Sequence, residues 1–475
     1  MHAKLTGILG VALLGASSLW AAPTITRLTP PSELFASQRS QPVVARFLPG
    51  QRFDLQATVL PDATTTITQV DFWMDGQAVA APVATQSCAT ACLKSVPTHA
   101  VVATVRAVSV QAPGVHTLEV RVVQSDGQSA RARGNFEIVA LQKGGRPVKN
   151  LIFMLGDGMG VAQRTAARIM AQGYAQGKAL APLAMDTLPV TGLVKTASLN
   201  SIVTDSSPGM SSYVSGNKHN NNEEGVFPDD TLDPFDNPRI EYLSEYLHRT
   251  QGKALGIVTT SDVFDATPAA MAVHSSNRGA GTGIVDQFLD DRQRTGLKVL
   301  MGGGRRWFLP TGTTGSTRSG ANDYAFSDQD PHTRDIVQRW GTAAGRIDPG
   351  RDLIADFQAA GFAYASNKAQ MDAMPEHTRQ LLGLFNLSNM NVALDKINGR
   401  RRTVGSPAVV DDFGAPDQPM LDEMTAKALQ VLQTHPQGFV LLVEGASIDK
   451  QAHGMDTERW ILDTIEFDRA VRVAR

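Results

Sequence analysis

The sequence predicts an α/β protein in which a mainly parallel sheet is covered by helices on both faces and is preceded by a small all-β sandwich. Three observations lead to this fold class. Short strands of alternating polarity fill residues 23–141, apolar strands alternate with helical stretches over 148–475, and a glycine-rich linker at 142–147 separates the two parts. The 475 residues, 42% hydrophobic and 19% charged, are typical of a globular protein with more than one domain.

The N-terminus has the pattern of a secretory signal peptide. Lys4 precedes an apolar run, Leu5–Trp20, and the small residues Ala21 and Ala22 follow it. The run is shorter than the roughly 20 residues that span a bilayer, so stable membrane insertion is not expected. We therefore predict a signal peptide at residues 1–22 and a periplasmic or secreted protein.

The region after the signal peptide reads as an immunoglobulin-like sandwich. Phe53–Val59 and His116–Val122 alternate apolar and polar residues, as half-buried strands do, and turns at Asp75-Gly76 and Asp126-Gly127 punctuate the pattern. The region holds no catalytic cluster. A spacer role is favoured over binding of glycans or another chain, and the sequence does not identify a partner.

Cys88 and Cys92 are the two cysteines of the chain. In an oxidising compartment they are expected to close a small disulfide loop, because their spacing is not that of a redox motif and no nearby histidines complete a metal site.

The net charge of −2 predicts no general attraction to nucleic acid. An anionic substrate must therefore be held locally, by metal ions or by single arginines.

Beyond residue 148 the pattern changes to that of a buried parallel sheet. Apolar runs typical of fully buried strands lie at 151–155, 255–258 and 439–443, and helical stretches lie at 352–357 and 420–432. The polar stretch Asn220–Asn237 is predicted to be a solvated loop, which is favoured over a calcium-binding loop.

The first chemical motif is Leu155–Gly160, directly after an apolar strand. Its glycine spacing is not that of a dinucleotide loop, and a carboxylate in the position of a pyrophosphate is electrostatically unfavourable. At the C-terminal end of a strand, Asp157 suits a metal ion instead.

The second motif surrounds Ser206 and Ser207. Pro208 fits the first turn of a helix, so the two serines lie at a helix N-terminus, which favours an alkoxide and an incoming anion. No histidine lies within sequence reach, so a metal would have to activate the serine. An ordinary helix cap is the competing interpretation of this motif.

The third motif contains Asp265, Thr267 and Arg278. Thr267 offers a hydroxyl ligand for a hard cation, and Asp265 offers a carboxylate that can contact the cation's waters. Arg278 can clamp two phosphate oxygens through its planar guanidinium. Each residue taken alone could be a cap or a surface charge.

The fourth motif follows an apolar strand that ends at Glu444. Asp449 and His453 are four positions apart, so on a helix they face the same way. A carboxylate and an imidazole on one helix face suit zinc.

Together the four motifs resemble the alkaline phosphatase family, from about residue 148 to residue 475. Three supporting stretches also look like the family, namely Leu300–Arg306, Leu381–Phe385 and Met424–Leu429. The resemblance implies hydrolysis of small phosphate monoesters through a phosphoserine intermediate, with two Zn²⁺ ions and one Mg²⁺ ion.

The resemblance also implies a role for each motif residue. Asp157 would bridge the second zinc and magnesium, and Ser206 would be the nucleophile at that zinc. Asp449 and His453 would hold the first zinc. Thr267 and Glu444 would hold magnesium, and Asp265 would contact its waters. Arg278 would bind the phosphoryl oxygens, and Lys450 would reach the phosphate through water.

The family places an Asp-His pair and a final histidine on later strands, which would lie beyond Arg475. We therefore expect a catalytic domain that is incomplete at its C-terminus. Each zinc would keep about two protein ligands, and this chain would be weakly active or inactive. The family also includes homodimers.

Two alternatives stay open. The wider superfamily contains phosphodiesterases and sulfatases, although Thr267, Glu444 and Arg278 favour monoesters. Alternatively, the chain is a non-catalytic exported binding protein whose sandwich carries the function. The retained ligand residues up to His453 speak against that interpretation.

Overall fold

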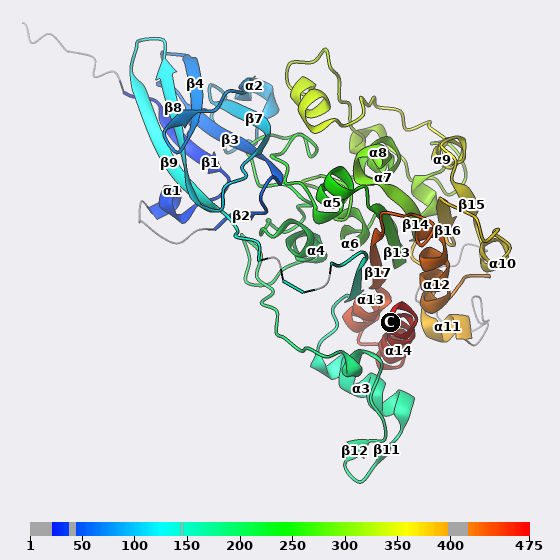
Figure 1. Ribbon diagram of the computed structural model, residues 1–475. Coiled ribbons are helices and arrows are strands. Elements are labelled where there is room, and N and C mark those ends of the chain that lie inside the picture. The colour runs from blue at the N-terminus through cyan, green and yellow to red at the C-terminus, as the bar shows by residue number, and fades with distance from the viewer. Residues whose placement is uncertain (1–20, 38–43, 143, 146, 398–416) are drawn as a thin grey trace, which may run out of the picture.

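The computed structural model describes residues 21–37, 44–142, 144–145, 147–397 and 417–475 (Figure 1). Most of the predicted signal peptide, 1–22, lies outside these residues, so it stays a prediction. Within the described ranges, no helix combines the length and the apolar character needed to cross a membrane.

The first part of the chain is a sandwich of two sheets, as predicted. One sheet has the order β1 (Thr24–Thr29), β3 (Arg52–Leu60), β7 (Val101–Ser109), β6 (Ala84–Ser87). The other has the order β2 (Arg46–Phe47), β9 (Ser129–Ile138), β8 (Gly114–Gln124), β4 (Ile67–Met74), β5 (Gln77–Ala78). Two short helices, α1 (Glu33–Ser37) and α2 (Cys88–Ala91), accompany them.

Aromatic residues fill the space between the two sheets. Phe47 stacks on Phe53 with ring centroids 3.8 Å apart, and Phe136 meets both rings edge-on. Cys88 and Cys92 form the predicted disulfide.

The prediction that Phe53–Val59 is half-buried is wrong, because every residue of this stretch is buried. Its apolar side chains face the sandwich core, while its polar side chains are covered by the loop that precedes α5. Gln56 donates to Asp229 at 3.3 Å, and Thr58 donates to Asp230 at 2.6 Å. The sandwich is therefore docked against the second part of the chain.

The same contacts correct the prediction of a solvated loop at 220–237. Most of this stretch is buried, since it lies between the sandwich and the second sheet. Arg27 forms a two-bonded ion pair with Asp230, at 3.1 and 2.9 Å, and an isolated bridge joins Cys92 to Thr231. Asp229 and Asp230 of the loop thus bind protein groups instead of water.

The second part of the chain contains a six-stranded sheet whose paired strands are all parallel. Its order is β10 (Leu151–Gly156), β17 (Phe439–Gly445), β13 (Ala254–Asp262), β14 (Leu297–Gly303), β16 (Leu381–Leu384), β15 (Ala363–Ala365). β13 and β17 are buried throughout, as predicted. β10 is only half-buried, against expectation, because it pairs with β17 alone and forms an edge of this sheet.

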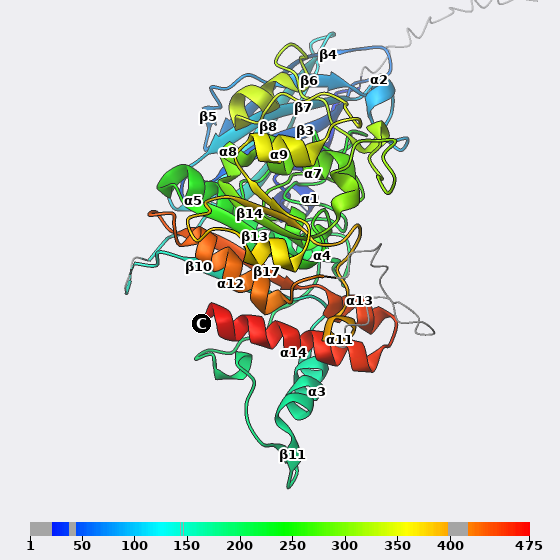
Figure 2. The same cartoon turned by 90° about the vertical axis from the view of Figure 1, so that its right-hand side faces the viewer.

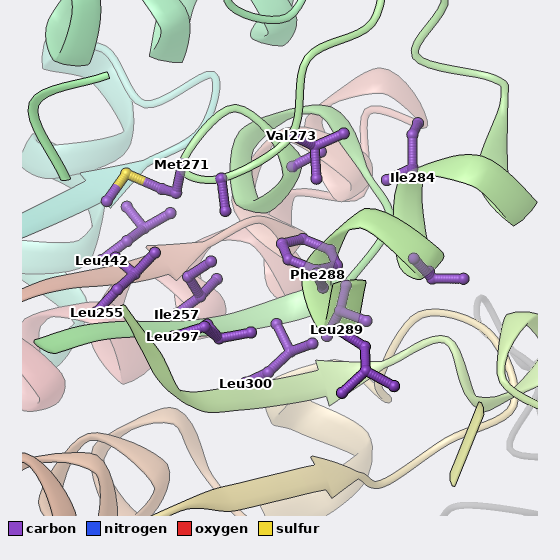
Figure 3. Packing of buried hydrophobic residues seen from close by; sticks show 14 of the residues in the cluster. Leu255, Ile257, Met271, Val273, Ile284, Phe288, Leu289, Leu297, Leu300 and Leu442 are labelled. Atoms are coloured by element: carbon purple, nitrogen blue, oxygen red, sulfur yellow. The ribbon is translucent and has the colours of Figure 1, made fainter. Parts of the chain in front are cut away.

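Helices cover both faces of this sheet, which confirms the predicted fold class (Figure 2). On one face α7 (Gly281–Asp290) packs its apolar side chains, including Phe288, over β13 and β14 (Figure 3). On the other face lie α12 (Leu421–Leu432) and α14 (Thr457–Ala474). The predicted helices at 352–357 and 420–432 are thus confirmed, as α9 (Leu353–Ala359) and α12.

The remaining elements connect these layers. They are α3 (Val161–Gln172), β11 (Tyr174–Ala175), β12 (Lys178–Ala179), η1 (Met185–Thr187), α4 (Ser206–Ser215), α5 (Leu243–Gln251), α6 (Ala266–Ala269), α8 (Arg292–Thr295), η2 (Arg305–Trp307), η3 (Gly320–Asn322), η4 (Ile336–Trp340), α10 (Lys368–Asp372), α11 (Ala393–Ile397) and α13 (Ser447–His453).

Candidate metal centre

Carboxylates gather at the C-terminal ends of the parallel strands, where α/β proteins bind ligands. Asp157 directly follows β10, and Glu444 lies near the end of the neighbouring β17. Thr259 of β13 is the register partner of Glu444 and donates to its Oε2 at 2.6 Å. Thr267, on α6, is also buried, and its hydroxyl acts to lower the pKa of Glu444.

A glycine allows Asp449 to approach Asp157. Gly158 has a φ of +60°, and a Cβ atom there would lie 2.4 Å from Asp449 Oδ1. Only glycine fits this position without a shift of the backbone or of Asp449. The glycine that follows Asp157 therefore lets the N-terminal turn of α13 pack against the end of β10.

Ser206 is the first residue of α4, and its hydroxyl donates to Asp157 Oδ2 at 3.0 Å. Asp205 caps the helix by accepting the Ser207 N–H at 2.7 Å. The Ser207 hydroxyl is buried and has no partner among the described residues. Of the two candidate serines, Ser206 is the one whose oxygen meets Asp157.

Two cations converge on Asp265, the N-cap of α6. Lys450 Nζ donates to Oδ2 and Arg278 Nη2 to Oδ1, both at 2.7 Å. Arg278 also lies 3.4 Å from Asp205, so it spans the caps of α4 and α6. The arginine is thus held beside Ser206 by two carboxylates.

The carboxylates of this cluster differ in the charge that balances them. Burial, and then the negative charge of Asp449, raise the pKa of Asp157 to about 6. Burial and then Asp157 raise the pKa of Glu444 to about 8, against hydrogen bonds from hydroxyls. Burial also acts to raise the pKa of Asp265, but Lys450 and Arg278 outweigh it and lower that pKa to about 2.

The structure thus brings together most of the predicted residues: Asp157, Ser206, Asp265, Thr267, Arg278, Glu444, Asp449 and Lys450. His453 lies at the margin instead, with 78% of its side chain exposed, and pairs with Asp449 at 3.1 Å.

Two acidic residues of this region were not predicted. Asp205 could have been found, since an Asp before Ser-Ser-Pro is a strong N-cap signal. Glu224 could not, because only the tertiary structure brings its loop here. Its carboxyl is fully buried, neither oxygen has a partner among the described residues, and burial raises its pKa well above the usual value, against the charge of Arg278.

A second acidic group, Asp286, Asp323 and Asp348, was also missed. It is the one group in the described ranges whose carboxylate oxygens lie within 4.8 Å of one another as metal ligands would. Arg318 already binds Asp286 with two bonds of 2.8 and 2.7 Å. Burial raises the pKa of Asp286 to about 6, and this bidentate pair opposes the shift.

The donors at the strand ends fit a divalent cation. Asp157, Glu444 and Thr267 offer only oxygen atoms, as Mg²⁺ prefers. Glu444 is fully buried and its carboxylate lacks an arginine or lysine partner among the described residues, a costly arrangement that a bound cation would relieve.

The fold and this cluster define an α/β protein with a serine and a cation-binding donor set at the C-terminal edge of a parallel sheet. The sequence profile of the alkaline phosphatase family matches residues 148–475. The chain therefore belongs to the alkaline phosphatase family, and the predicted resemblance is confirmed.

Characterised relatives are moderately similar. The chain is 30% identical over 399 residues to alkaline phosphatase of Escherichia coli K12, covering 76% of this chain and 74% of that one. It is 32% identical over 356 residues to the chicken tissue-nonspecific isozyme, covering 69% and 60%. The crystal structure of Thermus thermophilus alkaline phosphatase aligns with a TM-score of 0.50 at 26% identity, covering 70% and 56%.

The alignments thus span 60% of the chicken enzyme and 56% of the Thermus enzyme. A quarter of the chain also aligns with 98% of the titin M3 domain, at 13% identity and a TM-score of 0.15.

Proposed function

We propose that this chain carries the site for hydrolysis of phosphate monoesters, with Ser206 as the nucleophile and a phosphoserine as intermediate. One observation carries the proposal. The Ser206 hydroxyl lies at a helix N-terminus, 3.0 Å from the half-buried Asp157, in the same cluster as Arg278. This arrangement supports the proposal, because Ser206 would supply the nucleophilic oxygen and Arg278 would clamp the phosphoryl oxygens beside a strand-end carboxylate.

Each protein group has a role in the displacement at phosphorus. The Ser206 oxygen attacks the phosphorus while the ester oxygen leaves on the opposite side. The helix N-terminus of α4 stabilises negative charge on the attacking oxygen. Arg278, oriented by Asp205 and Asp265, donates to two phosphoryl oxygens. Lys450 adds positive charge behind Asp265.

Three cations complete the proposal. Asp157, Thr267 and Glu444 would hold Mg²⁺, with Asp265 near its waters. Asp157 and Ser206 would hold one Zn²⁺, and Asp449 and His453 the other. Bound metals would supply the positive charge that ionises the serine and stabilises the leaving oxygen. We further propose periplasmic or secreted location and small monoesters as substrates.

Ser206→Ala and the matched Ser207→Ala test the nucleophile. We expect Ser206→Ala to abolish acid-stable labelling from an aryl phosphate in single-turnover assays and to reduce turnover about a thousandfold or more. Ser207→Ala should keep the label and lose less than about tenfold. Zinc and magnesium are added in excess, because only two of the predicted ligands would hold each zinc.

Three results would count against the proposal. Labelling that survives in Ser206→Ala and disappears in Ser207→Ala would identify Ser207 as the nucleophile. Turnover that survives in both variants would place the chemistry elsewhere. Faster hydrolysis of a diester or a sulfate ester than of a monoester would favour the related activities.

A further inference from the structure

The junction between the sandwich and the α/β part contains a pocket of about 290 Å³ outside the metal centre. It lies between β3 of the sandwich and the elements α5, α8 and η4. Four basic and two acidic residues among its lining carry the argument, namely Arg52, His248, Arg249, Arg294, Glu241 and Glu245. We call it the junction pocket.

The two carboxylates of the junction pocket are fully engaged. Glu241 accepts two bonds from Arg249, at 2.6 and 2.8 Å, and a third from the backbone N–H of Arg52 at 2.9 Å. Glu245 accepts bonds from Arg294, from His274 and from the Tyr242 N–H. The capacity of these acids to accept further hydrogen bonds is therefore largely used.

Hydrogen-bond donors are left over at the same place. The Arg52 guanidinium makes no hydrogen bond or ion pair to any residue that the structure describes. Burial lowers the pKa of Arg52, and the positive charge of Arg249 lowers it further. Arg294 Nε is buried and also lacks a partner within the described ranges. The pocket thus presents unpaired N–H groups and unbalanced positive charge.

A second unbalanced charge lies behind the pocket. Arg239 is fully buried, and none of its three side-chain nitrogens has a hydrogen-bond partner in the described parts of the chain. Its guanidinium faces the Phe326 ring at 5.2 Å. Burial lowers the pKa of Arg239 to about 10, and the charge of Arg294 is the next cause.

Unpaired buried cations cost free energy unless a counter-charge is supplied. Here Arg249 and Arg294 have carboxylate partners, whereas the fully buried Arg239 and the half-buried Arg52 form no ion pair within the described residues. An anion in the junction pocket would restore the balance. A tetrahedral oxyanion matches the planar, multi-donor guanidinium better than a spherical ion does.

We propose that the junction pocket binds a small inorganic oxyanion, phosphate or sulfate, through Arg52 and Arg294, and thereby ties the sandwich to the α/β part. Arg52 belongs to β3 of the sandwich, whereas Arg294 belongs to α8. An anion held by both arginines crosses the junction, so its binding stabilises the docked arrangement of the whole chain.

The test uses the intact chain after treatment with a chelator, so that metals do not contribute. Thermal unfolding is followed while phosphate or sulfate replaces chloride at constant ionic strength. We expect a saturable rise in Tm of about 3 °C or more for both oxyanions. Arg52→Gln should lose this rise, and Arg131→Gln should keep it, because Arg131 is an exposed arginine on β9 of the same sandwich, outside the pocket.

A separate readout protects the test against a folding defect in Arg52→Gln. Equilibrium dialysis with labelled sulfate should give about one equivalent bound to the unmodified chain and at least tenfold weaker binding to the variant, and circular dichroism should confirm that the variant is folded. A rise in Tm that is equal in all variants would mean an adventitious ion only and would overturn the proposal. Binding that Arg278→Gln removes and Arg52→Gln retains would also overturn it, since the sulfate would then occupy the metal centre.

Discussion

Two partly buried carboxylate clusters of the α/β part, the metal centre and the group around Asp286, differ in what balances their charge. In the cluster of Asp286, Asp323 and Asp348, Arg318 forms a bidentate pair with Asp286. At the metal centre, Glu444 accepts a hydrogen bond from the hydroxyl of Thr259. Burial raises the pKa of Glu444 to about 8 and that of Asp286 to about 6.

Short distances between carboxylate oxygens are therefore not sufficient to identify a metal site. The cluster around Asp286 has the tighter geometry, but arginines already supply its positive charge. The oxygens at the metal centre are less tightly grouped, and burial raises the pKa values of Asp157 and Glu444. No arginine or lysine of the described residues forms an ion pair with either carboxylate, whereas Arg318 pairs with Asp286. A cluster that awaits a cation is therefore recognised by its missing counter-charge.

The largest expected effect comes from breaking the ion pair between Arg318 and Asp286. Arg318→Met leaves the buried Asp286 with a weaker contact to Arg351 at 3.9 Å, so we expect a loss of about 3–5 kcal/mol in the free energy of unfolding. Denaturant unfolding measures the change. The control is Arg346→Met, because this arginine is 86% exposed and pairs with Asp348, which should be worth about 0–1 kcal/mol. Equal small losses in both variants would break the comparison.

His219 tests whether burial without a counter-charge also favours the neutral form of a histidine, as it does for the carboxylates of the metal centre. It is fully buried, with Nδ1 2.7 Å from the carbonyl of Val226 and Nε2 2.9 Å from the Ser215 hydroxyl. Burial lowers its pKa to about 4 from an ordinary 6.5. The unfolded chain therefore binds the extra proton first, and stability present above about pH 6.5 is lost as the pH falls towards 4.

The loss should reach about 3 kcal/mol at pH 4, and His219→Gln should flatten this part of the profile. Urea unfolding at several pH values measures it. If the dependence of unfolding free energy on pH is the same in His219→Gln, the buried imidazole is not held in its neutral form. Burial without a counter-charge would then not explain the protonation state of this residue.

The same physics explains how much the sequence predicted. Runs such as Phe439–Val443 specify buried parallel strands by composition alone, and the fold class follows. The full burial of β3 was not predicted. Alternation of polar and apolar residues indicates that one face of a strand is buried, but it does not show whether another part of the protein also covers the polar face. Gln56 and Thr58 look like solvent-facing residues until Asp229 and Asp230 are placed beside them.

At the metal centre the sequence predicted residues that stand in local patterns. Asp157 follows an apolar strand, and Ser206 precedes a helical proline, so each could be found from its neighbours. Glu224 and the Asp286 cluster come from loops and helices that meet only in the folded chain. The exposed position of His453 could not be predicted either, since helical spacing fixes its direction relative to Asp449 but not its depth.

The prediction with the smallest expected effect tests directly which of the two carboxylate clusters binds a divalent cation. Mg²⁺ added to chelator-treated protein at about ten to a hundred times its Kd should raise the free energy of unfolding by about 1–3 kcal/mol. Glu444→Gln should remove this response, because it deletes a buried ligand, and should itself cost little without metal, since the carboxyl it replaces is held towards its neutral form. Asp323→Asn, the matched change in the other cluster, should leave the response intact. If Asp323→Asn removed it and Glu444→Gln did not, the cation would belong among Asp286, Asp323 and Asp348, and tight geometry would outweigh the arginines that now balance it.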